Sequence, residues 1–338
     1  MNRNLQRLWL ALFAGVIMTG GTLARADVVR TQTIQLQRGW NAVFLEVFPT
    51  NLEPASLFAG LPVSIVATYL HTETAVQYLR DPATIGWNRE GWGVWYAANR
   101  ADAFLSTLHA VHGNRTFLIQ ADQDCTWNIA GNVVLEPMRW KSDSFNLVGF
   151  CVDAQSPPTF EKFFSGSPAH RHYRIYRLTE GHWSLVTSPT ATAMRAGEAC
   201  WVHCKGGSDY MGPLSVRAKS SGRMVFTGED ESSLVVVNQS GDPATIQVQT
   251  VNTDAGVPLA YVQRGITDGR VDDFAFDLPA SQEMFVLEAG QKDAFRLKVR
   301  RERMQESTQS TLLKISNGAG AQVWVPVVAQ RRDLSTNP

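Results

Sequence analysis

The chain has 338 residues, and its 31 basic and 31 acidic side chains give a formal net charge of zero. This balance does not favour nucleic acid or an anionic membrane as a partner, because both require clustered positive charge. The length exceeds what one hydrophobic core usually serves, so two or three domains are expected.

The first 26 residues have the pattern of a secretory signal peptide. Arg3 and Arg7 form a basic start, residues 8–18 are apolar apart from Gly15, and Ala24-Arg25-Ala26 is a small-x-small cleavage site. The apolar run is shorter than the roughly 20 residues that span a bilayer. We therefore predict cleavage after Ala26 and an exported mature chain, periplasmic or extracellular, without a membrane span. That chain has 28 basic and 31 acidic residues, a formal net charge of −3.

Two segments of the mature chain share landmarks in the same order. Gly39-Trp40-Asn41 and Ser144-Phe145-Asn146 each lead into an apolar strand. Residues 57–62 and 163–168 then predict a short helix closed by Gly, with Pro just beyond it. Further along, Tyr69 matches Tyr176, Trp95 matches Trp183, and residues 113–119 match residues 197–203.

The shared order indicates two copies of one β module, residues 27–140 and 141–217. The alternative is chance similarity between strands, which all favour Val, Ile and aromatic residues. Copy one is longer because of an insertion around residues 80–112. Within it, Phe104, Leu105, Leu108 and Val111 have helical spacing and Gly113 follows as a stop, so residues 101–112 predict a helix.

The last third of the chain predicts a β-sandwich over residues 218–330, followed by a polar tail at 331–338. Short apolar segments separated by turn residues recur at even spacing, which is typical of sandwiches. The predicted strands are residues 223–227, 233–237, 245–251, 259–262, 273–276, 284–287, 294–299, 311–315 and 322–328. The polar tail is also what a linker to a further part of a longer protein would look like.

Two resemblances complete the fold expectation. Gly39-Trp40-Asn41 and Ala199-Cys200-Trp201-Val202 resemble a β module, repeated in secreted bacterial proteins, that begins Gly-Trp-Asn and ends in a Gly-x-x-Tyr/Trp-Trp-Val strand. Leu287-Glu288-Ala289-Gly290 and the strand at 323–328 resemble bacterial Ig-like domains. The resemblances imply an all-β protein: two related β modules with one or two short helices, followed by an Ig-like β-sandwich. They imply architecture and bring no catalytic residues.

The four cysteines are Cys125, Cys151, Cys200 and Cys204. In an exported protein they predict up to two disulfides. Cys200 and Cys204 share a strand face about 13 Å apart, which is too far for them to bridge each other. Cys151 is expected on the opening strand of copy two, beside the closing strand that holds Cys200 and Cys204. Cys151–Cys200 and Cys151–Cys204 are therefore both open as pairings, and Cys125 takes the remaining cysteine or stays free.

Four of the seven histidines, His170, His172, His182 and His203, fall in copy two. If the fold brings them together, they would form a zinc or copper site. No tight metal signature such as paired Cys-x-x-Cys motifs accompanies them, so surface or half-buried histidines are the favoured interpretation and no cofactor is expected.

Residues 87–96 contain four aromatic side chains, together with Asn88, Arg89 and Glu90. Flat indoles beside hydrogen-bonding groups suit a sugar, whose ring face lies on an aromatic ring while its hydroxyls are bonded. We expect Trp95 in the core, because bulky aromatics anchor small β domains. The ligand-binding candidates are Trp87, Asn88, Arg89, Glu90 and Trp92. The alternative for Trp92 is a core position that matches Trp183.

No catalytic residue is predicted. The chain has no Gly-x-Ser-x-Gly elbow and no Gly-rich phosphate loop. Glu73, Glu90, Asp102 and Asp124 would form a glycosidase pair only at the right separation. The favoured function is an exported, non-catalytic binding or scaffolding protein that contacts carbohydrate or a cell-surface protein. The alternatives are a periplasmic metal-binding protein and a glycan hydrolase.

Overall fold

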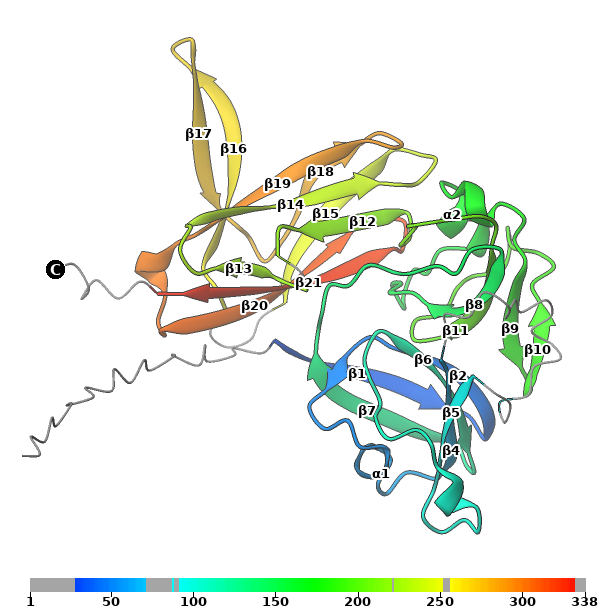
Figure 1. The fold of residues 1–338 in the computed structure, drawn as a ribbon. Helices are drawn as coiled ribbons and strands as arrows, with labels where there is room; N and C mark the ends of the chain where they lie inside the picture. Colours follow the sequence, from blue (N-terminus) through cyan, green and yellow to red (C-terminus); the bar gives the residue numbers. More distant parts are fainter. Residues whose placement is uncertain (1–27, 71–86, 88–90, 221, 252–255, 332–338) are drawn as a thin grey trace, which may run out of the picture.

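The computed structural model describes residues 28–70, 87, 91–220, 222–251 and 256–331, which fold into five β-sheets and a few short helical turns (Figure 1). This confirms the predicted all-β class. No helix among these residues has the length and hydrophobicity needed to cross a membrane.

Each predicted module contains one four-stranded sheet. In module one the strands are β2 (Gly39–Leu45), β4 (Val63–Tyr69), β5 (Trp92–Tyr96) and β6 (Arg115–Ala121), arranged β2-β6-β4-β5. In module two they are β8 (Ser144–Gly149), β9 (Ile175–Thr179), β10 (His182–Leu185) and β11 (Ala199–Cys204), arranged β8-β11-β9-β10. Numbered in chain order within each module, strand one pairs with strand four, strand four pairs with strand two, and strand two pairs with strand three at the edge of the sheet. Identical strand order is what a duplication predicts.

The asparagine of the opening motif has the same structural role in both sheets. Asn41 Oδ1 accepts a hydrogen bond from the Gln37 N–H, and its Nδ2 donates to the carbonyls of Gln37 and Gly39 at 2.7 and 3.0 Å. Asn146 Oδ1 likewise accepts from the Lys141 N–H, and its Nδ2 donates to the Lys141 and Ser144 carbonyls at 3.1 and 3.0 Å. The motif therefore closes the loop that leads into the first strand of each sheet.

Strand register aligns the two copies residue by residue. Asn41 lies opposite Ile119, and Asn146 lies opposite Val202. Leu118 of β6 is therefore equivalent to Trp201 of β11. The sequence comparison had paired residues 113–119 with 197–203, which is one residue out of step with this register. On the second strands the register makes Tyr69 equivalent to Leu178, and their partners Trp92 and Trp183 are therefore equivalent on the third strands. The matches of Tyr69 with Tyr176 and of Trp95 with Trp183 expected from the sequence are therefore wrong.

Module one has a second, smaller sheet behind the first. It consists of β1 (Val29–Leu36), β7 (Cys125–Asn132) and β3 (Phe48–Pro49), with β7 in the centre. The helix α1 (Pro54–Leu57) follows β3. The core between the two sheets includes Val43, Phe117, Ile119, Trp127 and the partly buried Trp95. Trp95 stacks on Phe58 with ring centroids 5.6 Å apart, so it has the core position expected from the sequence.

The front sheet of module one packs on the sheet of module two. Ile65, Ala67, Val94 and Leu118 contact Leu178 and Trp183, and Phe145, Leu147, Ala199 and Trp201 contact Ala42, Tyr69 and Trp92. The Phe44 N–H donates to the Gly197 carbonyl at 2.8 Å across the junction. Gly149 permits this approach, because a Cβ there would lie 2.1 Å from the Cβ of Phe44. The two modules thus share one core instead of folding as separate units.

The C-terminal part is the expected Ig-like β-sandwich. One sheet, ordered β12-β14-β19-β16-β17, contains β12 (Leu214–Ala218), β14 (Glu231–Asn238), β16 (Leu259–Thr267), β17 (Arg270–Asp277) and β19 (Lys292–Val299). The other, ordered β13-β21-β20-β15-β18, contains β13 (Met224–Phe226), β15 (Ala244–Val251), β18 (Ser281–Leu287), β20 (Thr308–Ser316) and β21 (Gln322–Gln330). Each predicted strand overlaps one of β13 to β21, whereas β12 starts upstream of the boundary predicted at residue 218.

The helix predicted for residues 101–112 is wrong. The segment forms only the 3₁₀ turn η2 (Ala103–Leu105), where the side chains of Phe104 and Leu105 are 84% and 55% exposed. Downstream, the backbone N–H groups of Thr107 and Leu108 both donate to the Val94 carbonyl on β5. Hydrogen bonding to a sheet edge therefore overrides the helical spacing in this segment.

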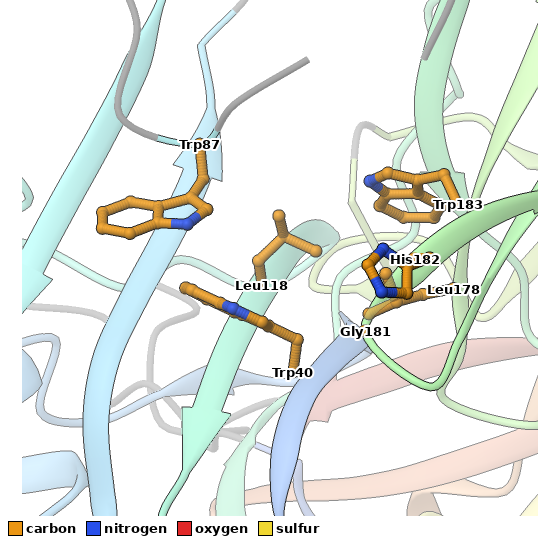
Figure 2. A pocket seen from close by; sticks show the side chains of 7 residues that line it. All are labelled: Trp40, Trp87, Leu118, Leu178, Gly181, His182 and Trp183. Atoms are coloured by element: carbon orange, nitrogen blue, oxygen red, sulfur yellow. The ribbon is translucent and has the colours of Figure 1, made fainter. Parts of the chain in front are cut away.

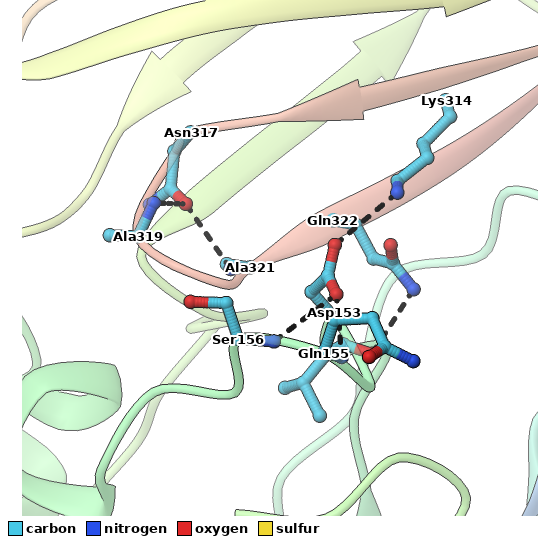
Figure 3. A network of polar contacts seen from close by, with 9 residues as sticks. Asp153, Gln155, Ser156, Lys314, Asn317, Ala319, Ala321 and Gln322 are labelled. Atoms are coloured by element: carbon cyan, nitrogen blue, oxygen red, sulfur yellow. Dashed lines mark hydrogen bonds and ion pairs between the residues drawn. The ribbon is translucent and has the colours of Figure 1, made fainter.

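The sandwich is joined to module two through a network of polar contacts (Figure 3). After β8, the Asp153 N–H donates to the Gly320 carbonyl at 2.8 Å, and Gln322 Nε2 donates to the Val152 carbonyl at 3.1 Å. Lys314 Nζ lies 3.4 Å from the Asp153 carboxylate in the same network.

A second junction joins module one to the sandwich. The Arg30 guanidinium contacts the buried Glu46 carboxylate at 2.5 Å and lies 4.4 Å from the centre of the Trp324 ring. Together the two junctions hold the three parts as one body.

The motif asparagine gives a stability prediction. Asn146 is fully buried, so Asn146→Ala leaves the Lys141 and Ser144 carbonyls without their donor. We expect the variant to lose about 1–3 kcal/mol of unfolding free energy, measured by urea denaturation. Asn99→Ala at an exposed position is the control and should change stability by less than about 0.5 kcal/mol. Equal losses in the two variants would contradict the role assigned to the motif.

Candidate binding cleft between the two modules

One end of the intermodule core is filled by aromatic side chains. Trp201 is fully buried and contacts the rings of Tyr69, Trp92 and Trp183 at centroid distances of 5.5, 6.5 and 6.1 Å. Among the described residues, neither Trp92 Nε1 nor Trp201 Nε1 has a hydrogen-bond acceptor in this core. This end is therefore filled by packed aromatic rings.

The other end of the same interface is open and forms a cleft of about 400 Å³ (Figure 2). Module one contributes Trp40 from β2, Leu118 from β6 and Trp87. Module two contributes Leu178 from β9, His182 and Trp183 from β10, and Gly181 from the turn between them. Figure 2 shows Trp40 and Trp87 on one side and Trp183 and His182 on the other, with Leu118 between them.

The local fold explains how these rings reach the cleft. Trp40 precedes the motif Asn41, whose hydrogen bonds fix the start of β2. The tight turn before His182 uses Glu180 and Gly181, which both have positive φ angles of 51° and 79°. Trp40 and Trp87 have ring centroids 5.2 Å apart and so form one aromatic surface. The three tryptophans of the cleft are only partly buried.

The described side chains that line the cleft are three tryptophans, two leucines and a histidine, along with one glycine. Flat indole faces on two sides suit a ligand with an apolar ring face. No Asp, Glu, Lys or Arg occurs in this described lining, so a charged ligand would find no ionic partner among these groups.

Of the ligand-binding candidates predicted from the sequence, the structure places one in the cleft and one in the core. Trp87 lines the cleft. Trp92 instead packs in the intermodule core, which is the alternative that the sequence left open for it. Asn88, Arg89 and Glu90 lie outside the described residues.

Sequence reasoning did not select Trp40, Leu118, Leu178 or Trp183 for the site. In the sequence, Trp40 and Trp183 serve only as landmarks shared by the two modules, and nothing there indicates that they line a site. Only the packing of one module on the other shows that the two rings line a shared space.

The four histidines of module two occupy different environments. His170 is 2% exposed, and its Nδ1 lies 2.6 Å from Ser167 Oγ, among the rings of Trp140, Phe164 and Tyr210. His182 lines the cleft, His172 is exposed, and His203 packs edge-on against Phe145. Within the described ranges, no group of three or more His, Cys, Asp or Glu side chains is placed to hold a metal ion.

The predicted disulfides are not formed, and Cys125, Cys151, Cys200 and Cys204 are all free. The expectation assumed that Cys151 lies on the first strand of module two. β8 ends at Gly149, and the residues opposite Cys200 and Cys204 on β8 are Val148 and Ser144. Burial raises the pKa of the Cys204 thiol to about 11 and that of Cys200 further still.

The carboxylates considered for a glycosidase pair do not line the cleft in the described part of the chain. Asp102 is bound to Arg100, and Asp124 accepts from the Arg38 N–H. Glu73, like Glu90, lies outside the described residues.

Comparisons with known proteins identify no family. No family model matches the chain, and no curated protein matches it. Among solved structures, the YadV chaperone shares 10% identity at a TM-score of 0.24, over 37% of this chain and 55% of that one. A PapD-like domain of human CEP192 (14%, TM-score 0.22) covers 36% of this chain and 87% of that one. The periplasmic chaperone SfaE (12%, TM-score 0.22) covers 37% and 60%. The chain thus spans just over half the length of YadV, and overlaps of this size assign neither family nor activity.

The buried histidine gives a pH prediction. Burial, with a smaller contribution from His203, lowers the pKa of His170 to about 4, whereas an unfolded histidine has a pKa of about 6.5. Between about pH 6.5 and pH 4, His170 is protonated in the unfolded chain but neutral in the folded chain. The free energy of unfolding therefore falls as the pH decreases through this range. We expect a loss on the order of 3 kcal/mol from this group.

Urea denaturation at pH 7, 5.5 and 4.5 measures this loss. The difference between the chain and its His170→Phe variant isolates His170 from other titrating groups, and His172→Gln at an exposed position is the control. Identical pH slopes for the chain and the His170→Phe variant would contradict the assignment.

Proposed function

We propose that this protein is an exported, non-catalytic binding protein and that carbohydrate is held in the cleft between its two modules. The observation that carries the proposal is the set of partly buried tryptophans, Trp40, Trp87 and Trp183, that line opposite sides of an open cleft of about 400 Å³.

Stacking supplies the affinity in this proposal. The C–H face of a sugar ring is apolar and lies on an indole, while its hydroxyl groups stay hydrated or bond to polar neighbours. Aromatic side chains bury large areas with few rotatable bonds, so ordering them costs little entropy. Trp40 and Trp87 already contact each other, which fixes one wall before a ligand arrives.

The remaining architecture supports binding rather than turnover. Hydrolysis of a glycosidic bond uses two carboxyl groups that flank the bond. The described lining supplies stacking surfaces and one histidine instead. Export is inferred from the signal sequence of residues 1–26.

The proposal predicts different effects for tryptophans that differ only in location. Trp183→Ala and Trp87→Ala each remove a stacking surface and should weaken binding about tenfold, equivalent to ~1.4 kcal/mol. Trp87→Ala should change the melting temperature little, whereas Trp183→Ala also loses its contact with Trp201 and should lower the melting temperature, by less than Trp92→Ala does. Trp92→Ala opens a cavity in the core and should cost roughly 3–5 kcal/mol of stability. Retention in polysaccharide gels and thermal melts measure the two effects.

Phe104→Ala is the control for retention, because Phe104 is 84% exposed and lies outside the cleft. If the Trp183 and Trp87 variants unfold as readily as the Trp92 variant, those rings are structural and the proposed site is wrong. If both variants stay folded and keep the retention of the unmodified chain, carbohydrate binding in the cleft is likewise excluded.

A further inference from the structure

The two copies differ at one position that decides whether their shared interface is filled or open. By strand register, Leu118 in module one is equivalent to Trp201 in module two. Leu118, which is itself only 5% exposed, forms part of the cleft wall, whereas Trp201 is fully buried at the filled end. The same position in the same sheet topology therefore carries a small side chain at the open end and a large one at the closed end.

The side chains beside this position are also smaller in module one than in module two. Leu118 lies between Ala42 on β2 and Ala67 on β4. The equivalent neighbours of Trp201 are Leu147 on β8 and Tyr176 on β9. Module two thus presents three larger side chains to the interface where module one presents three smaller ones. Ala42 packs against the larger side chains of module two, and the cleft lies against Leu118.

The rings around the two positions show the consequence. Trp92 and Trp183 are equivalent by register on the third strands. Trp92 packs against Trp201 and Tyr69 in the filled end. Trp183 touches Trp201 on one side and borders the cleft with Leu118 on the other. One of two equivalent tryptophans is therefore used in the core, and the other remains available to a ligand.

We propose that Leu118 determines the depth of the cleft and that this depth admits a neutral sugar ring, with Leu118 beneath the ring and tryptophans beside it. The proposal rests on the proposed function, since it names the class of sugar for the same site. Neutral sugars are favoured over uronic or sialic acids because the described lining offers a carboxylate no Lys or Arg side chain.

The test compares the exported chain with its Leu118→Trp variant, which places at the cleft the side chain that module two has. Probes are soluble β-glucan, xylan and starch as neutral polymers, and alginate and polygalacturonate as uronate polymers. We expect the unmodified chain to be retained by at least one neutral polymer and not by the uronate polymers. Leu118→Trp should lose at least tenfold in affinity. Because Leu118 is only 5% exposed, the larger ring is also expected to lower the melting temperature, so affinity is compared at a temperature at which both chains are folded.

Leu105→Trp is the matched control, because Leu105 is 55% exposed and lies outside the cleft. Acrylamide quenching of tryptophan fluorescence without ligand is an independent readout of cleft depth. A tryptophan at position 118 that fills the cleft should reduce quenching of its neighbours, and the Leu105→Trp variant should not show this. If Leu118→Trp does not fold, Leu118→Ala keeps the test valid, because a deeper cleft should change the order of preference among the neutral polymers.

The outcomes separate the two proposals. If the unmodified chain binds no polymer although quenching confirms that Leu118→Trp closes the cleft, the proposed function fails while Leu118 still sets the depth. If the chain binds neutral polymers and Leu118→Trp binds them equally well, the role of Leu118 is overturned. Equal or stronger retention by alginate or polygalacturonate overturns the neutral class of ligand.

Discussion

The packing of the two four-stranded sheets, which share one strand order, is the interaction on which the rest of this molecule depends. Trp201 lies at its centre, fully buried, in contact with Tyr69 and Trp92 of the first module and Trp183 of the second. Burial of large aromatic surfaces is among the strongest contributions that a small β domain can make to its stability. The cleft lies at the end of this interface where module one has Leu118 at the position equivalent to Trp201.

The back faces of the two sheets are covered differently, and this fixes the remaining architecture. The sheet of module one packs on its own three-stranded sheet, whereas the sheet of module two shares a hydrophobic core with the sandwich. Arg30, Glu46 and Trp324 meet where module one contacts the sandwich. Buried ionic contacts of this kind are weak evidence for stability, but they penalise any arrangement that leaves one charge unpaired. A rigid frame holds the walls of the cleft in place before a ligand binds, which lowers the entropic cost of binding.

Local signals made much of this fold predictable. Short apolar segments and turn residues located every sandwich strand from β13 to β21, because most of these strands pack one face on the core of the sandwich. β17 is the exception, since nearly all of its residues are exposed. The landmarks of the duplication, including Asn41 and Asn146, also came from the sequence, since each is needed for a hydrogen-bonded turn. The helix expected at residues 101–112 failed because hydrogen bonds to β5 are tertiary contacts that spacing does not reveal.

The site was predicted less well, for a physical reason. Its walls come from two sheets whose relative placement depends on which face of each sheet is buried against the other. Trp87 was found from composition, but Trp40, Leu118 and Trp183 acquire their role only when the sheets are packed. The disulfide expectation failed for a related reason, because it required Cys151 to lie within β8 and the strand ends at Gly149.

The central claim is that one of two equivalent ends of the intermodule core is open and receives the ligand. Nuclear magnetic resonance of the chain with ¹⁵N-labelled indoles tests it most directly, because each tryptophan Nε1–H reports on its own surroundings. On titration with a retained neutral polysaccharide, the account predicts shifts for Trp40, Trp87 and Trp183 and none of comparable size for Trp127, which is buried behind β2 and β6. Shifts that avoid the three cleft tryptophans, or that spread equally over all indoles, would contradict it.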